Sequence, residues 1–286
     1  MYDYTYRFFY YVGIINKPYC YSKVKKIKID MKKGILKFLV SFILMTIGTT
    51  FVFAAPDIKD ENLHYVISYK WGLIHKDAGE ATLSLRNRGQ NYDIMLAAKT
   101  KPWADKFYQV RDTLMGKIRK SDFKAISYTK IAHEDGKYGK DVISYSYSGK
   151  QVTGVCKRYK KNKKGEVSTS SKTLTASGPV YDMLSVFYYL REIDYESLEK
   201  NKVLKATVFS GSKAETITIH LVGKEKIKLR NKAEREAYHI TFNFTTGGKK
   251  KSSDDIDTWI STDSSHIPLY LTGSLPVGQV RAYYIP

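Results

Sequence analysis

The residues that could bind a metal ion or act as nucleophiles are few, and they do not cluster along the sequence. None of the six histidines belongs to an H-E-x-x-H pattern, which places two zinc ligands on one helix face. The chain has two cysteines, so a zinc ribbon, which needs several paired cysteines, is excluded. We therefore expect no metal site and no cofactor. The histidines are His64, His75, His133, His220, His239 and His266.

Three short motifs resemble catalytic or calcium-binding patterns, but each has a simpler structural interpretation. Residues 210–213 (Ser-Gly-Ser-Lys) match S-x-x-K yet lie in a predicted hairpin turn, whereas that chemistry needs a helical turn between serine and lysine. Asp254, Asp255 and Asp257 lack the glycine and glutamate of a calcium loop. Residues 263–266 (Asp-Ser-Ser-His) could relay a proton, but Asp and Ser commonly satisfy backbone groups in turns. We therefore predict no catalytic residue and no enzyme.

A second possible start at Met31 opens the pattern of a secretory signal peptide. Residues 31–37 are basic, residues 38–53 are apolar, and Ala54 supplies the small side chain that cleavage requires. We expect residues 31–54 to be a signal peptide that exports the protein to the periplasm or the periplasmic face of the outer membrane. An uncleaved anchor is the alternative, since the apolar run approaches the roughly 20 residues of a membrane span. Residues 1–30 match no targeting pattern, and we interpret them as a mis-called upstream extension, with a genuine cytoplasmic extension as the alternative.

The chain is strongly basic, with 48 Lys and Arg against 28 Asp and Glu. A charge of this sign suggests an anionic partner, and export argues against nucleic acid. Phospholipid headgroups, phosphorylated glycolipids and acidic glycans are the candidates, and a solvated lysine-rich surface without a single partner is the alternative. Cys156 is the one cysteine after the predicted signal peptide, so no internal disulfide can form there. It lies in a strand-like run, where we expect it to be buried.

Short alternating segments separated by turn residues dominate residues 55–286. This pattern favours a mainly β protein, with an antiparallel curved sheet or a partly open β-barrel. Apolar residues at helical spacing predict one short helix packed on the sheet at about 179–191, where Pro179 suits the first turn. We expect a single all-β domain, or two lobes divided near 177–203. The strand-like runs lie at about 63–71, 79–86, 92–99, 107–118, 124–133, 141–148, 151–159, 166–175, 203–210, 215–222, 225–230, 237–245, 256–261, 268–274 and 278–284.

Three blocks of sequence resemble a known family. Residues 63–74 with 78–81 resemble the opening of the uncharacterised bacterial domain-of-unknown-function family numbered 3108, and Tyr-Tyr-Leu-Arg at 188–191 resembles its central block. Residues 259–263, 266–268 and 276–280 resemble its close. The resemblance implies an exported, mostly antiparallel β protein of the Gram-negative envelope, and it brings no activity or catalytic set. His-Lys-Asp at 75–77 departs from the expected shorter first turn.

Aromatic residues and lysines provide the binding candidates. A curved sheet closed by a helix could line a cavity with aromatic rings, although such rings more commonly fill a core. For a ligand-binding site we select Trp71, Trp103, Phe187, Tyr188 and Trp259. For contact with an anionic headgroup we select Lys160, Lys161 and Lys163, within a basic tract that otherwise reads as a solvated hairpin tip.

Three functions remain open at this stage. The first is non-enzymatic binding of an amphipathic ligand, either lipid or glycolipid, in an aromatic-lined cavity. The second is a structural or interaction module that docks an envelope protein through edge strands or basic loops, which a solid core with a large exposed apolar patch would favour. The third is an enzyme acting on glycan or peptidoglycan, which would need two carboxylates facing each other in a cleft.

Overall fold

The computed structural model describes residues 58–198, 202–246, 250–251, 253–274 and 278–286. The predicted extension at 1–30 and the predicted signal peptide at 31–54 lie outside these residues. Everything described falls within one compact unit. None of its helices is long and apolar enough to cross a membrane.

Strands make up most of the described chain, and they form one 16-stranded sheet. The two helices in this part of the chain are short, α2 (Pro102–Asp105) and α3 (Ser185–Arg191). The strands are β1 (Glu61–Trp71), β2 (Ile74–Arg88), β3 (Asn91–Thr100), β4 (Val110–Arg119), β5 (Ala125–Glu134), β6 (Lys137–Ser148), β7 (Gln151–Lys161), β8 (Val167–Ser177), β9 (Val180–Asp182), β10 (Val203–Ser210), β11 (Lys213–Lys228), β12 (Glu234–Thr246), β13 (Lys250–Lys251), β14 (Ile256–Ser261), β15 (Pro268–Ser274) and β16 (Gln279–Ile285).

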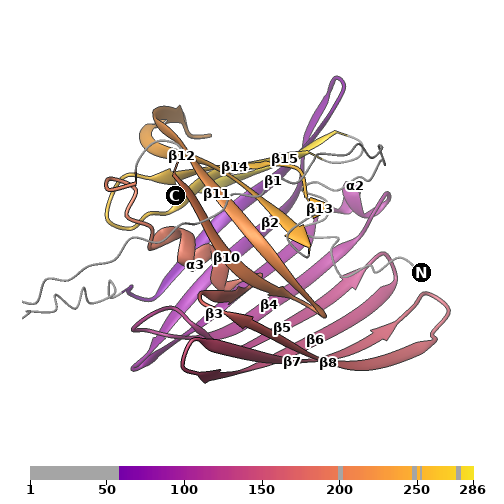
Figure 1. The fold of residues 1–286 in the computed structure, drawn as a ribbon. Coiled ribbons are helices and arrows are strands. Elements are labelled where there is room, and N and C mark those ends of the chain that lie inside the picture. Colours follow the sequence, from indigo (N-terminus) through magenta and orange to yellow (C-terminus); the bar gives the residue numbers. More distant parts are fainter. Residues whose placement is uncertain (1–57, 199–201, 247–249, 252, 275–277) are drawn as a thin grey trace, which may run out of the picture. The chain divides into compact units, whose positions relative to one another are not determined.

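The sheet curls into a nearly closed barrel with a single seam. Its strand order is β8-β7-β6-β5-β4-β3-β2-β1-β16-β15-β14-β12-β11-β10-β9, with β13 paired to β12 alone. Strands β1 to β8 form a continuous antiparallel meander (Figure 1). Strand β1 also pairs with the last strand, β16. The first and last strands of this order, β8 and β9, are not paired with each other, and the seam is the place where they meet. The predicted mainly β, partly open barrel is therefore confirmed.

Alternation along each strand explains why the sheet encloses a core. In β3 the inward positions Tyr92, Ile94, Leu96 and Ala98 are all buried, whereas Met95 between them is exposed. Because successive side chains of a strand point to opposite faces, this period of two gives the meander one apolar face. The apolar faces of the strands merge into one large hydrophobic core.

The seam is closed by side chains rather than by a continuous ladder of backbone hydrogen bonds. The Phe209 ring of β10 stacks on Tyr145 of β6 with 5.9 Å between ring centroids. A Cβ added to Gly154 of β7 would lie 2.6 Å from that phenylalanine ring, so only glycine lets the two sides approach this closely. Arg158 of β7 binds Asp141 at 2.8 Å and donates a 2.9 Å hydrogen bond to Ser212 beyond β10.

The segment after the seam differs from the predicted helix at 179–191. Its first residues form β9, which pairs in parallel with β10, and α3 begins only at Ser185. Asp182 accounts for the switch, because its Oδ1 accepts hydrogen bonds from the backbone N–H groups of Leu184 and Ser185, both at 2.8 Å. The Ser185 hydroxyl accepts one from the Asp182 N–H in return. This reciprocal capping starts the helix and places its N-terminal end at the seam.

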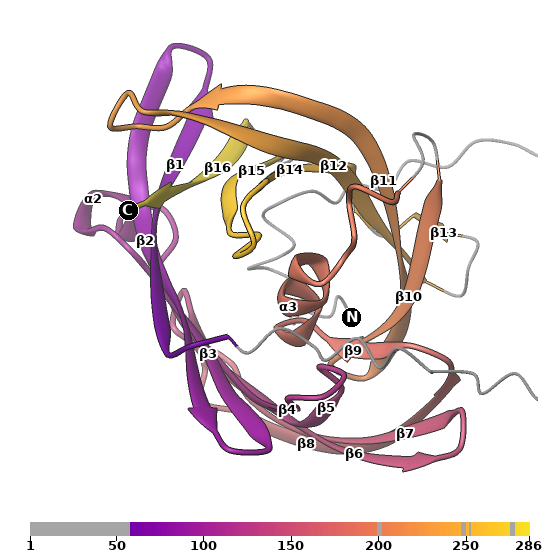
Figure 2. The same ribbon diagram turned by 90° about the vertical axis from the view of Figure 1, so that its left-hand side faces the viewer.

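Helix α3 lies inside the ring of strands (Figure 2). The Tyr188 hydroxyl donates to the Ser84 carbonyl of β2, at 3.2 Å. Arg191, almost fully buried, forms an ion pair with Glu61 of β1 and donates to the Ser265 carbonyl at 2.9 and 3.0 Å. These contacts tie the helix to β1, β2 and the connection between β14 and β15.

Two further differences from the sequence prediction concern α2 and β11. The single-turn helix α2 lies between β3 and β4, where no helix was expected. The predicted strands at 215–222 and 225–230 are one long strand, β11, whose register shifts between Leu221 and Gly223. A bulge keeps the hydrogen bonding continuous while bending the strand, so the interruption seen in the sequence is not a turn. Cys156 is fully buried, as predicted.

We predict that Gly154→Ala lowers the free energy of unfolding by about 1–3 kcal/mol, because the new methyl group overpacks against Phe209. Gly139→Ala is the matched control on neighbouring β6, since its nearest neighbour would be the Ala132 methyl group at 4.0 Å. Urea unfolding measures both. Equal stability of the two variants would contradict a tightly packed seam.

We predict that Asp182 makes stability depend on pH in an unusual direction. Burial raises the pKa of Asp182 from 3.8 to about 6, although its hydrogen bonds to backbone N–H groups oppose the shift. The stabilisation from protonation is therefore present below the unfolded pKa and is lost as the pH rises through about 6. Relative to Asp182→Asn, the wild type should lose about 3 kcal/mol between about pH 4 and pH 7 in unfolding experiments. The exposed control Asp254→Asn should follow the wild type; an equal trend in Asp182→Asn would contradict the assignment.

Candidate functional site: an apolar cavity within the barrel

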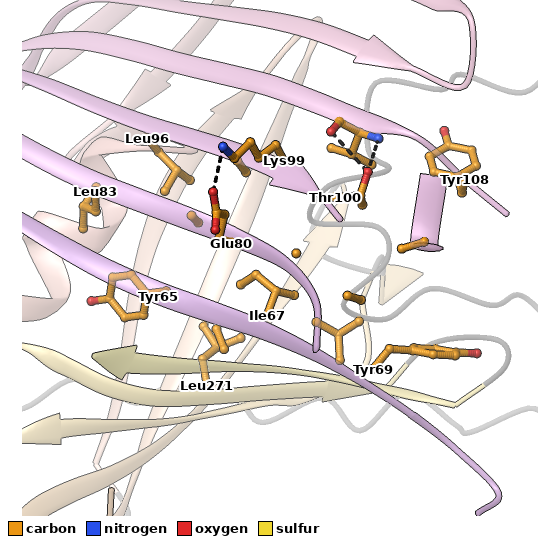
Figure 3. Close-up of a pocket in the computed structure, with 18 of the residues that line it drawn as sticks. Tyr65, Ile67, Tyr69, Glu80, Leu83, Leu96, Lys99, Thr100, Tyr108 and Leu271 are labelled. Carbon is orange, nitrogen blue, oxygen red and sulfur yellow. Dashed lines mark hydrogen bonds and ion pairs between the residues drawn. The ribbon is translucent and has the colours of Figure 1, made fainter. Parts of the chain in front are cut away.

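The described part of the barrel contains a cavity of about 570 Å³ whose lining is almost entirely apolar. Its walls come from β1, β2 and β3 on one side and from β14, β15 and β16 on the other (Figure 3). Phe187 of α3 also lines it. This volume lies within the range of small-molecule sites, about 300–1,000 Å³. The inward-facing wall residues include Tyr65, Ile67, Leu83, Leu96, Phe242, Ile256 and Leu271.

Small residues make room for the cavity at its centre. Ala81 of β2 and Ala98 of β3 are directly opposite each other in the strand pairing, and both line the cavity. Gly79 continues this strip, and a Cβ there would lie 2.7 Å from the Lys99 carbonyl oxygen. Large side chains at Ala81 and Ala98 would fill the space that the surrounding leucine and aromatic residues enclose.

The cavity opens to solvent beside the β1–β2 turn and α2. Three of its lining residues are among the exposed large apolar side chains, namely Trp71, Ile74 and Phe107. Trp103 of α2 also lines this region, and its indole N–H donates a 2.8 Å hydrogen bond to the Asp77 carbonyl. The mouth is therefore aromatic, and α2 is held against the base of the hairpin.

Polar groups in the lining have partners in the protein itself. The Tyr65 hydroxyl donates to the Pro268 carbonyl at 3.0 Å, and burial raises the pKa of this tyrosine well above its usual value. Glu80 and Lys99 form an ion pair at 2.7 Å, with both side chains more than half exposed. Among the described lining residues, Glu80 is the one carboxylate, and none is His or Cys. The interior surface thus suits a hydrocarbon group.

A buried charged cluster lies on the same inward face of the sheet, next to Tyr108. The Tyr108 hydroxyl donates to Glu134 at 3.0 Å, and Lys130 contacts both Glu134 and Asp112 at 3.4 Å. Burial raises the pKa of Asp112 to about 7, with Lys130 opposing the shift and Glu134 adding to it. The cluster is compensated by the lysine, and Asp112, which is directly opposite Ala98 in the strand pairing, is not among the residues that line the cavity.

The structure brings together three of the five predicted ligand-binding residues. Trp71, Trp103 and Phe187 all line the cavity. Tyr188, which belongs to α3, is fully buried and is not part of the lining. Trp259 also lies outside it, with its ring stacked on His239 at 4.3 Å and its indole N–H donating to Glu225. Spacing on α3 could have separated Phe187 from Tyr188, because adjacent helical positions point in different directions.

The predicted headgroup lysines lie at the end of β7 and in the turn that follows. Lys163 forms an ion pair with Asp135 at 2.6 Å, and none of the three lysines lines the cavity. The turn after β7 lies at the same end of the strands as the β1–β2 turn, because alternate turns of an antiparallel meander lie at one end. Five strand-to-strand steps separate β2 from β7. The three lysines are Lys160, Lys161 and Lys163.

The remaining sequence motifs have structural roles. Ser210 and Lys213 flank the two-residue turn between β10 and β11, as predicted. Asp263 accepts hydrogen bonds from Ser261 and from the Ser265 N–H, as expected for a turn. Within the described residues, no group of three or more His, Cys, Asp or Glu side chains could hold a metal ion.

Sequence reasoning missed the alanines of the wall and Phe107 at the mouth. Alternation in residues 79–86 and 92–99 places Ala81 and Ala98 on the inward faces, which was a usable signal. No local pattern marks Phe107, because its exposure depends on the helical turn that precedes it.

One solved structure shares the fold of this chain. The chain is similar to a beta-barrel-like protein of a domain of unknown function, DUF1849, from Brucella abortus. The TM-score is 0.55 at 10% sequence identity, covering 80% of this chain and 96% of that one, which supports the fold alone. A comparison with curated proteins found no match. Fold and site together define a β-barrel-like domain with an internal apolar cavity.

The family follows from the sequence. The model of a family described as Protein of unknown function (DUF3108) matches residues 64–284. The chain therefore belongs to this family, which confirms the resemblance seen in its three sequence blocks. The family description names no activity.

We predict that the buried cluster depends on its lysine. Lys130→Met should lower the free energy of unfolding by about 3–5 kcal/mol at neutral pH, because it leaves two buried carboxyl groups without a positive charge. The loss should grow as the pH rises and Asp112, whose pKa burial raises to about 7, ionises. Lys124→Met is the control, since this half-buried lysine pairs with Asp122 at 2.9 Å and its removal should cost less than about 1 kcal/mol. Urea unfolding at several pH values tests both, and similar losses for the two variants would refute the prediction.

Proposed function

We propose that this protein is an exported, non-enzymatic binding protein that holds an amphipathic ligand, a lipid or glycolipid, in its barrel cavity. The observation that carries this proposal is the cavity of about 570 Å³, whose lining is apolar and whose mouth is aromatic. Burial of a hydrocarbon chain in such a site is favourable by about 0.8 kcal/mol for each methylene group. The polar end of the ligand would remain at the open side.

The setting of the protein supports the same proposal. The signal pattern at 31–54 suggests delivery to the periplasm or the periplasmic face of the outer membrane. Amphipathic molecules that cross an aqueous compartment need a carrier, because their chains are poorly soluble in water. Without residues 1–54 the chain has 39 Lys and Arg against 26 Asp and Glu, and this formal net charge of +13 suits the anionic headgroups of envelope lipids.

Two alternatives remain distinguishable from ligand binding. A structural module that docks an envelope protein would need no ligand in the cavity. A glycan- or peptidoglycan-acting enzyme would need a pair of facing carboxylates about 5–10 Å apart, and Glu80 is the one carboxylate among the described lining residues. Neither alternative uses an apolar interior.

The cavity can be filled to test the proposal. Ala98→Trp places a large ring in the cavity and should weaken binding of a dansyl-labelled fatty acid at least tenfold in a fluorescence titration. Ala97→Trp is the matched control, because the adjacent residue points to the outer face of the same strand. Native mass spectrometry of protein purified from its own envelope should show an added mass in the wild type that Ala98→Trp loses.

The result can go against the proposal in two ways. If Ala98→Trp binds the probe as tightly as Ala97→Trp, the probe does not occupy this cavity. If the wild type neither binds the probe nor carries an added mass, the docking module becomes the better explanation.

A further inference from the structure

Exposed apolar side chains gather at the mouth of the cavity. In the β1–β2 hairpin, Leu73 is fully exposed at 106% of its reference area, Trp71 is 55% exposed and Ile74 is 47% exposed. Phe107, which follows α2, is 79% exposed. We call these four residues the apolar tip. Among the exposed large apolar residues of the described chain, Leu73 and Phe107 have the two highest exposures.

The hairpin carries this apolar tip away from the body of the barrel. Trp71 and Ile74 are paired across the strands, with Gly72 and Leu73 forming the turn between them. Gly72 has a φ of +55°, and a Cβ there would meet nothing within 4 Å, so the turn projects into open space. The ribbon shows the same projection beyond the neighbouring strands (Figure 1).

Contacts between α2 and the hairpin hold the two parts of the tip together. Trp103 donates its indole N–H to the Asp77 carbonyl at 2.8 Å, and the Lys76 ammonium lies 4.7 Å from the centre of the Trp103 ring. The Trp103 and Phe107 rings meet edge to face at 6.2 Å. The apolar tip is therefore a surface that contacts between β2 and α2 hold in place.

The charges around the tip are predominantly positive. Lys70, Lys76 and Lys106 are exposed beside it. The nearby acids are paired with arginines, Asp77 with Arg230 at 2.9 Å and Asp105 with Arg111 at 2.7 Å. An apolar point beside three exposed lysines matches the interface of an anionic bilayer, where aromatic rings and aliphatic groups enter the boundary region and lysines stay at the headgroups.

We propose that the apolar tip docks the protein on an anionic phospholipid bilayer and aligns the cavity mouth with the membrane surface. Trp71, Ile74 and Phe107 belong both to the tip and to the cavity lining, so the apolar surface is continuous from membrane to cavity. Only one part of the inference rests on the proposed function, namely that the ligand enters the cavity from the bilayer. Docking itself depends on the tip alone.

The test is vesicle co-sedimentation of protein purified from cells that express the full chain, so that any processing has taken place. Vesicles of phosphatidylcholine with phosphatidylglycerol should bind the wild type at least tenfold more tightly than vesicles of phosphatidylcholine alone. Leu73→Glu, which puts a negative charge at the tip but leaves the cavity lining unchanged, should lose at least tenfold in binding. Val203→Glu makes the same change at an exposed β10 residue outside the tip and should stay within twofold of the wild type.

The fatty-acid titration separates failure of docking from failure of ligand binding. Leu73→Glu should bind the dansyl probe like the wild type, and Ala98→Trp should bind vesicles like the wild type. Vesicle binding that is equal in Leu73→Glu and Val203→Glu overturns the docking proposal. So does a wild type that binds the probe but no vesicles. A wild type that binds vesicles but not the probe supports docking and removes the cavity as the ligand site.

Discussion

The position of α3 inside the barrel is the constraint on which the site depends. A helix enclosed by strands must satisfy its polar groups within the protein, and Asp182 and Arg191 do so at its two ends. Breaking a buried ion pair such as Arg191 with Glu61 typically costs about 3–5 kcal/mol, so the helix has little freedom to leave. Because it stays, Phe187 forms part of the cavity lining, and Tyr188 packs between the helix and β2.

Residue size then decides where the barrel is solid and where it is hollow. At the seam, glycine at 154 lets Phe209 fill the space between β7 and β10. On the opposite stretch of sheet, Ala81 and Ala98 face each other with no large side chain between them. The same alternating pattern therefore yields a packed core at one place and a cavity at another, and inward-facing volume makes the difference.

The fold could be predicted from the sequence because local residue patterns mark most of its strands. Alternation located nearly every strand, and the three family blocks identified the relatives of the chain. The errors lie where tertiary contacts decide. Residues 180–182 have a helical sequence pattern but form β9, because they pair in parallel with β10. The two strands predicted within 215–230 are one strand, β11, which contains a bulge. The site was only partly predictable, since aromatic type selected Trp71, Trp103 and Phe187 but could not show that Trp259 stacks outside the cavity lining.

The apolar tip differs from these elements because the fold does not require apolar side chains at its positions. A two-residue hairpin turn needs backbone conformations that glycine supplies at position 72, but the side chain at 73 packs against nothing that stabilises the barrel. A polar residue there would serve folding equally well and solubility better. The presence of leucine at 73 and phenylalanine at 107, on separate elements that Trp103 holds together, is therefore best explained by what the tip contacts outside the protein.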